Sequence, residues 1–464
     1  MLTELRLQNF KAWRDTGPLR LAPLTVIFGT NSSGKSSLGH LLRALKQTVL
    51  MTDRKRSLHL GDDNALIDLG TYGDCIHGHD LSRPLQFELK WKTSTPLEVE
   101  DILDASRRYG GEELKLSAEI GATGTEQPET RQFTYQLFND NQLVLTARNG
   151  RRDGKAFLEC DPIRLVRAQG RKWDVEAPEK FYRFSDKTLS RYQNAEFLTD
   201  FVLETEQLLG NFYHLGPLRS PPQRVYAWSG DTPLDVGAQG QQTISAILAA
   251  TQQGRSLNRG LNQRYQLFDA FIASWLKDLG IIHRFKVEQI APGRKEYEAQ
   301  IQIHKRAHWV KLTDVGFGVS QVLPALVQAF YSPPSAVMWM EQPEIHLHPR
   351  VQANLADAFI SATKAREGGE DRDVQMIVES HSEHLLNRLQ RRVAEGEVRP
   401  EEVAIYFVSR HGGAAHIEPL RLNEFGDIEN WPDNFFGDDM EDITQRALAA
   451  ARKRKAKKVQ EARA

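Results

Sequence analysis

A short glycine-rich segment, FGTNSSGKSS at residues 28–37, constrains the fold of this chain more than any other feature. It fits the pattern G-x-x-x-x-G-K-[ST], whose glycines let the backbone turn tightly so that successive N–H groups face a phosphate. A buried-strand pattern at residues 24–28 precedes the loop, and residues 36–50 carry leucines at helical spacing. The segment therefore predicts a phosphate site between a strand and the positive N-terminus of a helix.

The side chains of this loop have separate predicted roles. Lys35 is expected to reach the β- and γ-phosphates of ATP, and to be exposed when no nucleotide is bound. Ser36 is expected to bind Mg²⁺ through its hydroxyl. The other predicted nucleotide-binding residues of the loop are Asn31, Ser32, Ser33, Gly34 and Ser37. ATP and Mg²⁺ are thus the predicted cofactors.

Three short apolar runs in the C-terminal half, at residues 336–340, 374–378 and 403–408, alternate with helical stretches. This βαβ alternation predicts a parallel sheet and an α/β fold. Glu341 directly follows the first run, where a carboxylate can complete a Mg²⁺ site at the carboxyl edge of the sheet. His381 follows the second run, and we expect it near the γ-phosphate.

Changes in sequence pattern along the chain predict five parts. Alternating apolar and polar residues with Gly/Asn turns indicate antiparallel strands after residue 83, and helical spacing dominates after residue 185. The predicted parts are the N-terminal ATPase core (1–83), an antiparallel β subdomain (84–185), a helical insertion (186–280), the C-terminal core (281–440) and a basic, helical or disordered tail (441–464).

Composition excludes several classes of protein. Lys+Arg 60 and Asp+Glu 61 nearly cancel, so the overall charge gives no argument for a nucleic-acid partner. Two cysteines cannot build a disulfide framework and favour a reducing compartment. No apolar run approaches the length of a membrane span, and the N-terminus alternates like a strand rather than a signal peptide. We therefore expect a cytoplasmic protein with no membrane partner.

Five segments, in the order LQNFKAW, the phosphate loop, DVGFGVSQVLP, MEQPEIHLHP and VESHSEHLL, resemble the RecF/SMC/OLD-like branch of ABC ATPases. The resemblance covers residues 1–50 and 310–410 well and the middle only loosely. It is greatest to the stand-alone ATPases of bacterial anti-phage defence or toxin-like effector systems. It implies an ABC-type P-loop NTPase fold with a mainly parallel sheet, an antiparallel β subdomain and a helical insertion.

The resemblance also implies roles for individual residues. Glu341 takes the position of the Walker B carboxylate, and Gln342 stands where the family has its catalytic glutamate. The other carried-over positions are Phe10 and Lys11 beside the nucleotide, residues 346–349 as the D-loop, and His381 as the switch histidine.

Residues 315–321 fall where the family has its signature loop, which contacts ATP held by the other protomer. Gly316 and Gly318 take the loop positions, and Ser320 and Gln321 are expected to open a helix. The resemblance therefore implies a homodimer with two shared ATP sites related by two-fold symmetry; higher oligomers are left open.

Gln342 is the main departure from the family pattern. An amide cannot accept a proton as a general base. Either Glu344 or His381 substitutes as the catalytic residue, or hydrolysis is slow and the chain acts as a long-lived ATP switch. The sequence leaves these alternatives open.

We therefore predict a slowly hydrolysing ATPase that dimerises around ATP and acts as a sensor or scaffold. Its expected partner is a separately encoded effector, as the resemblance to anti-phage ATPases implies. The alternative is a RecF-like, DNA-binding ATPase in DNA repair or maintenance. An intrinsic nuclease is rejected because about 55 residues follow Val408, without a strand-plus-Asp-x-Asp pattern.

Overall fold

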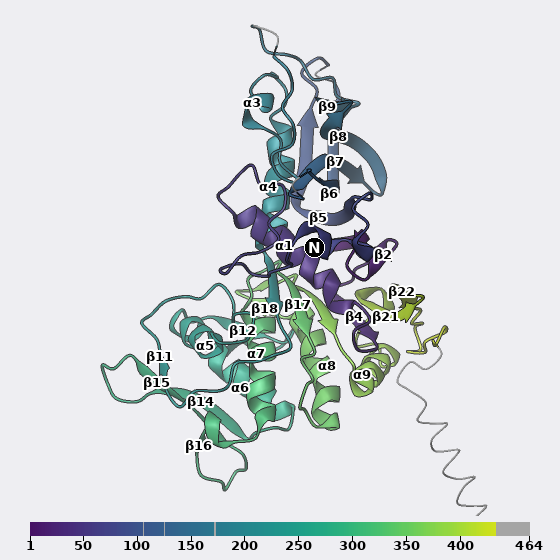
Figure 1. The fold of residues 1–464 in the computed structure, drawn as a ribbon. Helices are drawn as coiled ribbons and strands as arrows, with labels where there is room; N and C mark the ends of the chain where they lie inside the picture. Colours follow the sequence, from purple (N-terminus) through teal and green to yellow (C-terminus); the bar gives the residue numbers. More distant parts are fainter. Residues whose placement is uncertain (105, 125, 171–172, 433–464) are drawn as a thin grey trace, which may run out of the picture.

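The computed structural model describes residues 1–104, 106–124, 126–170 and 173–432. Its strands form four sheets, of which a parallel one and a long antiparallel one build the body of the molecule (Figure 1). The described helices are α1 (Lys35–Leu50), α2 (Tyr72–Cys75), α3 (Asp186–Leu189), α4 (Phe197–Gly210), α5 (Thr243–Gln252), α6 (Phe268–Asp278), α7 (Phe317–Tyr331), α8 (Pro349–Lys364) and α9 (Glu383–Ala394).

The parallel sheet has the strand order β10-β17-β20-β4-β21-β22, with β22 antiparallel to its neighbour. Its members are β10 (Phe212–Leu215), β17 (Val337–Glu341), β20 (Gln375–Glu379), β4 (Leu24–Gly29), β21 (Val403–His411) and β22 (Ala414–Leu420). The strands β4, β17 and β20 are buried throughout because helices or the second sheet cover both faces. The three apolar runs predicted as parallel strands are confirmed.

The antiparallel sheet has the order β2-β1-β5-β6-β7-β8-β9, with β3 also paired to β1, and stands at the top of Figure 1. Its members are β1 (Leu2–Phe10), β2 (Trp13–Asp15), β3 (Leu19–Arg20), β5 (Leu85–Glu100), β6 (Arg108–Ala122), β7 (Pro128–Asn139), β8 (Gln142–Arg152) and β9 (Lys155–Asp161). Burial alternates along the central part of β6, as expected for a sheet with one covered face. Thus the predicted antiparallel β unit exists, but it includes β1–β3 from the part assigned to the core.

The predicted helical insertion at 186–280 is wrong in one respect. Helices α4, α5 and α6 lie there, but the segment also contains β10, which pairs in parallel with β17 and so belongs to the core sheet. The four residues FYHL, three of them apolar, are too short a run to be separated from the neighbouring helix by periodicity alone.

Two small antiparallel sheets complete the fold. The first consists of β11 (Tyr226–Ala227), β14 (Arg284–Gln289), β15 (Glu296–Gln302) and β16 (Val310–Lys311), at the lower left of Figure 1. The second consists of β12 (Ser256–Asn258), β13 (Gln266–Leu267), β18 (Arg366–Glu367) and β19 (Glu370–Asp371).

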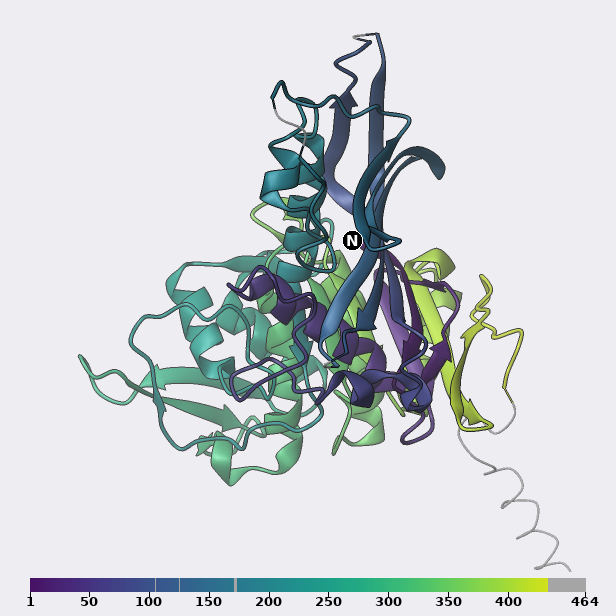
Figure 2. The same cartoon turned by 45° about the horizontal axis from the view of Figure 1, so that its top comes forward.

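The hydrophobic core lies on both faces of the parallel sheet, because alternate residues of a strand point to opposite sides. Met338 and Met340 of β17 join the cluster that contains α7 and α8, whereas Val337 and Trp339 join the cluster that contains α1 and the antiparallel sheet. Helix α1 is therefore enclosed between the two large sheets, as Figure 2 also shows.

In the described part of the chain, no helix is long and apolar enough to cross a membrane. The basic tail predicted at 441–464 lies outside the described residues.

Candidate nucleotide site

The phosphate loop joins β4 to α1 and has the backbone that its glycines allow. Gly29 has φ 151° and Gly34 has φ 108°, conformations that residues with a Cβ rarely adopt. A Cβ on Gly29 would lie 2.2 Å from the carbonyl oxygen of Val408, and one on Gly34 would lie 2.9 Å from the Cβ of Ala12. Both glycines are therefore required by close packing as well as by the turn.

Lys35 does not lie as the sequence predicted. Its side chain is buried, with 6 % exposure, and its Nζ donates to the carbonyl oxygens of Gly29 and Thr30, both at 2.9 Å. The prediction of an exposed lysine is wrong because the loop carbonyls offer acceptors that fold the side chain back. Burial lowers the pKa of Lys35, while the nearby carboxylates of Glu379 and Glu344 oppose this shift.

Two carboxylates stand side by side at the carboxyl edge of the parallel sheet. Glu341 ends β17 and Glu379 ends β20, and the two residues are partners in the parallel register. The Oγ of Ser36 donates to Oε2 of Glu379 at 2.8 Å, and the indole Nε1 of Trp339 donates to Oε1 at 2.6 Å. Burial, followed by the charge of Glu341, raises the pKa of Glu379 to about 8.

Glu341, the predicted metal ligand, has a different environment. Its Oε1 is 2.7 Å from Nε2 of His214, and both side chains are buried. Although burial works against it, the hydrogen bond from His214 holds the pKa of Glu341 below its ordinary value. The guanidinium of the half-buried Arg219 donates to the carbonyl oxygen of Glu341 at 3.3 Å. Burial lowers the pKa of Arg219 to about 10, so it stays charged.

Glu344 supports the turn that carries His381. Its Oε1 accepts hydrogen bonds from the hydroxyl of Ser380 at 2.8 Å and from the backbone N–H of His381 at 2.7 Å. Burial raises the pKa of Glu344. Burial, together with the charge of Lys35, lowers the pKa of His381 to about 4, so its imidazole is neutral at pH 7. His381 thus lies close enough to Lys35 to feel its charge.

Gln342 leaves the end of β17 in a left-handed conformation, φ 44°. Its backbone N–H donates to the carbonyl oxygen of Glu379 at 2.9 Å, and its carbonyl accepts from the N–H of Ile345. The half-buried side chain stands at the same sheet edge as both strand-end glutamates. The base role considered for Glu344 or His381 stays a prediction.

The two residues predicted beside the nucleotide at the N-terminus differ in exposure. Phe10 is fully buried in the core, whereas Lys11 is half-buried and has a left-handed backbone, φ 48°. Any direct contact of the Phe10 ring with a nucleotide would require it to leave the core. In the loop, Asn31 and Ser32 are exposed, and Ser33 and Ser37 are buried.

The predicted signature segment begins α7, away from the phosphate loop. Gly316 is exposed at the N-cap, and a Cβ on Gly318 would have Leu347 and His346 as its nearest neighbours. The helix begins at Phe317, so Ser320 and Gln321 lie three and four residues after its first residue, and both are buried. The expectation that Ser320 and Gln321 open the helix is therefore corrected by one turn.

Buried polar atoms without a hydrogen-bond partner collect around this site. Within the described residues they include Oε2 of Glu344, Nδ1 of His214, and Nε and Nη1 of Arg219. Such atoms are rare in folded proteins and indicate a water, an ion or a ligand, or a functional role. Sequence reasoning missed four residues here: Trp339, Glu379, His214 and Arg219. Of these, Glu379 had a visible signal, since it ends an apolar strand as Glu341 does.

The donor set fits Mg²⁺, which prefers oxygen ligands and keeps several waters. Ser36 offers a hydroxyl, and Glu341 and Glu379 offer carboxylates at one sheet edge. The described residues contain no cluster of three or more His, Cys, Asp or Glu able to hold a metal alone.

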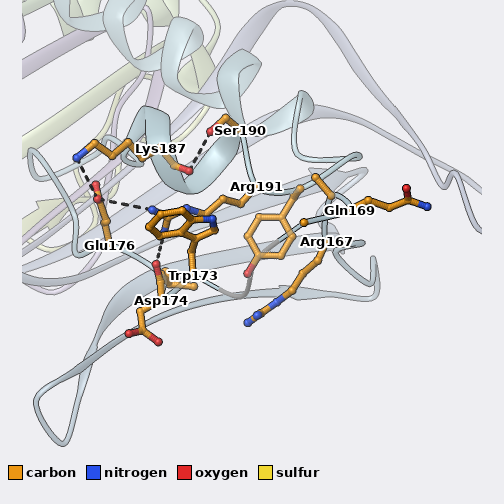
Figure 3. Close-up of a pocket in the computed structure, with 12 residues that line it drawn as sticks. Arg167, Gln169, Trp173, Asp174, Glu176, Lys187, Ser190 and Arg191 are labelled. Atoms are coloured by element: carbon orange, nitrogen blue, oxygen red, sulfur yellow. Dashed lines mark hydrogen bonds and ion pairs between the residues drawn. The ribbon is translucent and has the colours of Figure 1, made fainter.

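A pocket of about 1000 Å³ lies elsewhere, lined by residues 167–170, 173–176, 187 and 190–192 (Figure 3). Arg191 stacks on the ring of Trp173, and Lys187 and Arg191 pair with Glu176 at 3.4 and 3.9 Å. None of the phosphate-loop or strand-end residues lines it. Cavity size is therefore a poor guide to the nucleotide site in this molecule.

Residues 255–387 match a protein-family model described as an AAA domain, putative AbiEii toxin, Type IV TA system. This segment contains α7, β17 and β20, hence the strand-end carboxylates and His381. The chain has the fold of an ABC-type P-loop ATPase. The predicted fold class and the recognition of the RecF/SMC/OLD-like branch are confirmed. Residues 398–445 of this ATPase match a second family model, a protein of unknown function named DUF3696.

Solved structures similar to this ATPase include three SMC heads. One is an SmcHead bound to the C-winged helix domain of ScpA, with TM-score 0.44, 11 % identity, and coverage of 91 % of this chain and 98 % of that chain. Another is the SMC head domain from Thermotoga maritima, with TM-score 0.40, 12 % identity, and coverage of 90 % and 98 %. A third, from Pyrococcus furiosus, has an extended coiled coil and is bound to the C-terminal domain of ScpA, with TM-score 0.40, 9 % identity, and coverage of 91 % and 96 %. No curated protein sequence matches the chain.

Proposed function

We propose that this ATPase binds Mg²⁺–ATP at the loop of residues 29–37, pairs with a second copy around the nucleotide and hydrolyses it slowly. The observation that carries the proposal is the contact of Ser36 with a strand-end carboxylate beside the buried ammonium of Lys35. Together they place a hydroxyl, a cation and backbone N–H groups where phosphates and a metal would bind.

The residues at the sheet edge divide the work of hydrolysis. Lys35 leaves the loop carbonyls and meets the phosphates, and Gln342 orients the attacking water through its amide oxygen without taking a proton. His381, neutral at pH 7, is available as a hydrogen-bond partner for the γ-phosphate. Lacking a strong general base, an effect typically worth about 10²–10⁴-fold, the site turns over slowly.

The position of α7 supports a shared site. Gly318 lies against His346 and Leu347, whereas the loop glycines lie against Val408 and Ala12. These different surroundings favour a signature loop that serves the partner's nucleotide rather than its own. The exposed helix start at Gly316 offers N–H groups to a γ-phosphate across a two-fold interface.

The test of pairing uses Gly318→Asp in the full chain. A carboxylate at this position should repel the partner's γ-phosphate, so ATP should still bind each monomer but no longer induce dimers. Light scattering with a non-hydrolysable ATP analogue measures the dimers. Mixing Gly318→Asp with Lys35→Ala should give at most one working site per heterodimer. Normal pairing and hydrolysis by Gly318→Asp alone would contradict the shared site.

The biological role that we propose is control of a separately encoded effector, in anti-phage defence and in the cytoplasm. The description of the matching family, a putative toxin of a type IV toxin–antitoxin system, supports a two-component arrangement. ATP-bound dimers would hold the effector, and hydrolysis would change that hold. Co-purification of the neighbouring gene product, in the presence and absence of an ATP analogue, tests this role. A partner that binds identically in both conditions would contradict it.

A DNA-binding ATPase of the RecF type is the second candidate, and one surface favours it. Arg284, Lys305 and Arg306 are exposed near one end of the β14–β15 hairpin and, among the described residues, have no carboxylate within ion-pair distance. The side chain of Trp309 is 37 % exposed in the same loop. Cations beside an aromatic ring suit a nucleic-acid backbone and its bases. Salt-dependent DNA binding that Lys305→Glu/Arg306→Glu abolishes would support this candidate.

A further inference from the structure

The hydroxyl of Ser36 is held by a carboxylate one strand closer to the phosphate loop than Glu341. We propose that Glu379 is the principal protein carboxylate of the Mg²⁺ site, and that Glu341 is a supporting residue fixed by His214. This inference rests on the proposed binding of Mg²⁺–ATP and assigns the metal ligand within that site.

Strand order gives Glu379 the nearer position. Strand β20 lies directly beside β4, and β17 lies on the far side of β20. In the parallel register Glu379 is the partner of Ile27 on one side and of Glu341 on the other. Neighbouring strands are about 4.8 Å apart, so Glu341 starts one strand spacing farther from the loop that follows β4.

The Ser36 hydroxyl faces both carboxylates, since it also lowers the pKa of Glu341, but the other hydrogen bonds of the two carboxylates differ. Oε2 of Glu379 accepts from the Ser36 hydroxyl at 2.8 Å, so it already touches the side chain expected to bind the cation. Oε1 of Glu341 is 2.7 Å from Nε2 of His214, a contact that directs this oxygen toward β10. The carboxylate of Glu379 therefore has the geometry toward Ser36 that a metal-site carboxylate requires.

Trp339 fixes the orientation of Glu379. Its indole Nε1 donates to Oε1 at 2.6 Å, and the ring is fully buried. A Cβ on Gly39 of α1 would lie 2.7 Å from that ring, so the helix packs directly on the indole. A carboxylate positioned by a rigid donor is pre-organised for a cation, as outer-shell partners are in metal sites.

Charge gives the reason for a divalent ion. Two adjacent buried carboxylates repel one another unless a proton or a cation lies near them. Among the described residues Lys35 forms no ion pair with either of them, and its ammonium donates to the carbonyl oxygens of Gly29 and Thr30 instead. A Mg²⁺ ion beside Ser36 would neutralise the pair with the oxygen ligands it prefers.

The test measures Mn²⁺ binding, in place of Mg²⁺, to the full chain with a non-hydrolysable ATP analogue, using the electron paramagnetic resonance signal of free Mn²⁺. Nucleotide affinity without metal is measured by calorimetry. Glu379→Gln should weaken Mn²⁺ binding by about tenfold or more, in the range of outer-shell and ligand changes at metal sites, and leave metal-free nucleotide affinity nearly unchanged. Glu341→Gln, the matched control, should weaken Mn²⁺ binding by a smaller factor.

Two further variants keep the test decisive if Glu379→Gln folds poorly. Glu379→Asp retains the charge and should recover part of the Mn²⁺ affinity. Trp339→Phe removes only the indole donor and should weaken Mn²⁺ binding less than Glu379→Gln. A Glu341→Gln loss larger than those of Glu379→Gln and Glu379→Asp would overturn the assignment. If the parent binds the ATP analogue equally well with and without metal, the proposed Mg²⁺–ATP site itself fails.

Discussion

A buried lysine lies at each end of helix α1, but only the lysine at the C-terminal end uses all its hydrogen-bond donors within the chain. At the C-terminal end, Nζ of Lys180 donates to the carbonyl oxygens of Thr48, Val49 and Met51 at 2.7, 3.3 and 2.9 Å. All three ammonium donors are used, and the positive charge lies at the negative end of the helix dipole. This end of the helix is stabilised by the protein alone.

The N-terminal end has the opposite electrostatics. The ammonium of Lys35 has two carbonyl acceptors, and it lies at the positive end of the same helix. A buried cation at this place is unfavourable until an anion arrives. Lys180, which stabilises the fold, thus has all its hydrogen-bond acceptors within the chain. Lys35, which is proposed to bind a ligand, has a positive charge that no anion among the described residues pairs with.

The largest expected effect comes from a substitution at the N-terminal, ligand-binding end of α1. Lys35→Ala removes the cation that faces the phosphates, so affinity for a non-hydrolysable ATP analogue should fall by about 100-fold or more, as expected for loss of a charged hydrogen bond. The melting temperature without nucleotide should not fall, because the substitution removes a buried charge from the positive helix end. Calorimetric titration and thermal unfolding measure both. Unchanged affinity in a folded variant would contradict the assignment of the phosphate loop.

The next largest effect is expected from a substitution at the C-terminal end of α1. Lys180→Met keeps the length of the side chain but leaves three carbonyl oxygens at the end of α1 without their donor. The free energy of unfolding should fall by about 2–3 kcal/mol, and nucleotide affinity should stay within about twofold of the parent. Denaturant unfolding and calorimetry test this pair of expectations. A variant as stable as the parent would show that water can replace the ammonium.

A smaller effect tests whether the ligand-binding end lacks a general base. Gln342→Glu keeps the shape of the side chain and adds a proton acceptor, so the single-turnover rate should rise by about tenfold or more. Glu344→Gln should slow the parent more than it slows the Gln342→Glu variant if Glu344 substitutes as a base. Rapid-quench measurements on both single variants and the double variant distinguish these cases. A parent that turns over several times per second, with Gln342→Glu no faster, would remove the slow-switch proposal.

The smallest effect reports on the charge of Lys35. The pKa of His381 is about 4 in the folded chain, below the ordinary value for histidine, so between these values the unfolded chain binds more protons. Its contribution to stability is therefore present above pH 6.5 and is lost as the pH falls toward 4. Lys35→Ala should raise the pKa of His381 and narrow this window. Histidine NMR titrations, compared with those of Lys180→Met, measure the shift; equal values in both variants would contradict the coupling.

Sequence predicted the parts of the site that depend on local pattern. The phosphate loop and the strands ending at Glu341 and Glu379 follow from short motifs and apolar runs, because glycine turns and buried parallel strands have local signatures. The burial of Lys35 could not be predicted in this way. The burial depends on which loop carbonyl oxygens lie within hydrogen-bond distance of Nζ, and this is known only once the loop is folded.

Long-range contacts account for the other differences. In the sequence Trp339 is one apolar residue among others in a strand. The hydrogen bond from its indole N–H to Glu379 on the neighbouring strand is visible only in the structure. The four residues of β10 were placed in a helical insertion, because nothing local shows that they pair with β17, about 125 residues later. His214 was therefore missed together with its strand.

The close approach of Gly29 to β21 means that inactivating substitutions at Gly29 and at Lys35 have different consequences in a genetic study. Any side chain at Gly29 must displace the carbonyl of Val408, so loss of function there would mix strand separation with loss of nucleotide binding. A host carrying such an allele could lack the protein altogether through degradation. Lys35→Ala alters a side chain that no strand packing requires, so it can supply a stable, nucleotide-free protein that still pairs with the parent chain around one remaining ATP. A dominant-negative phenotype should therefore appear with Lys35→Ala and be absent with Gly29→Val.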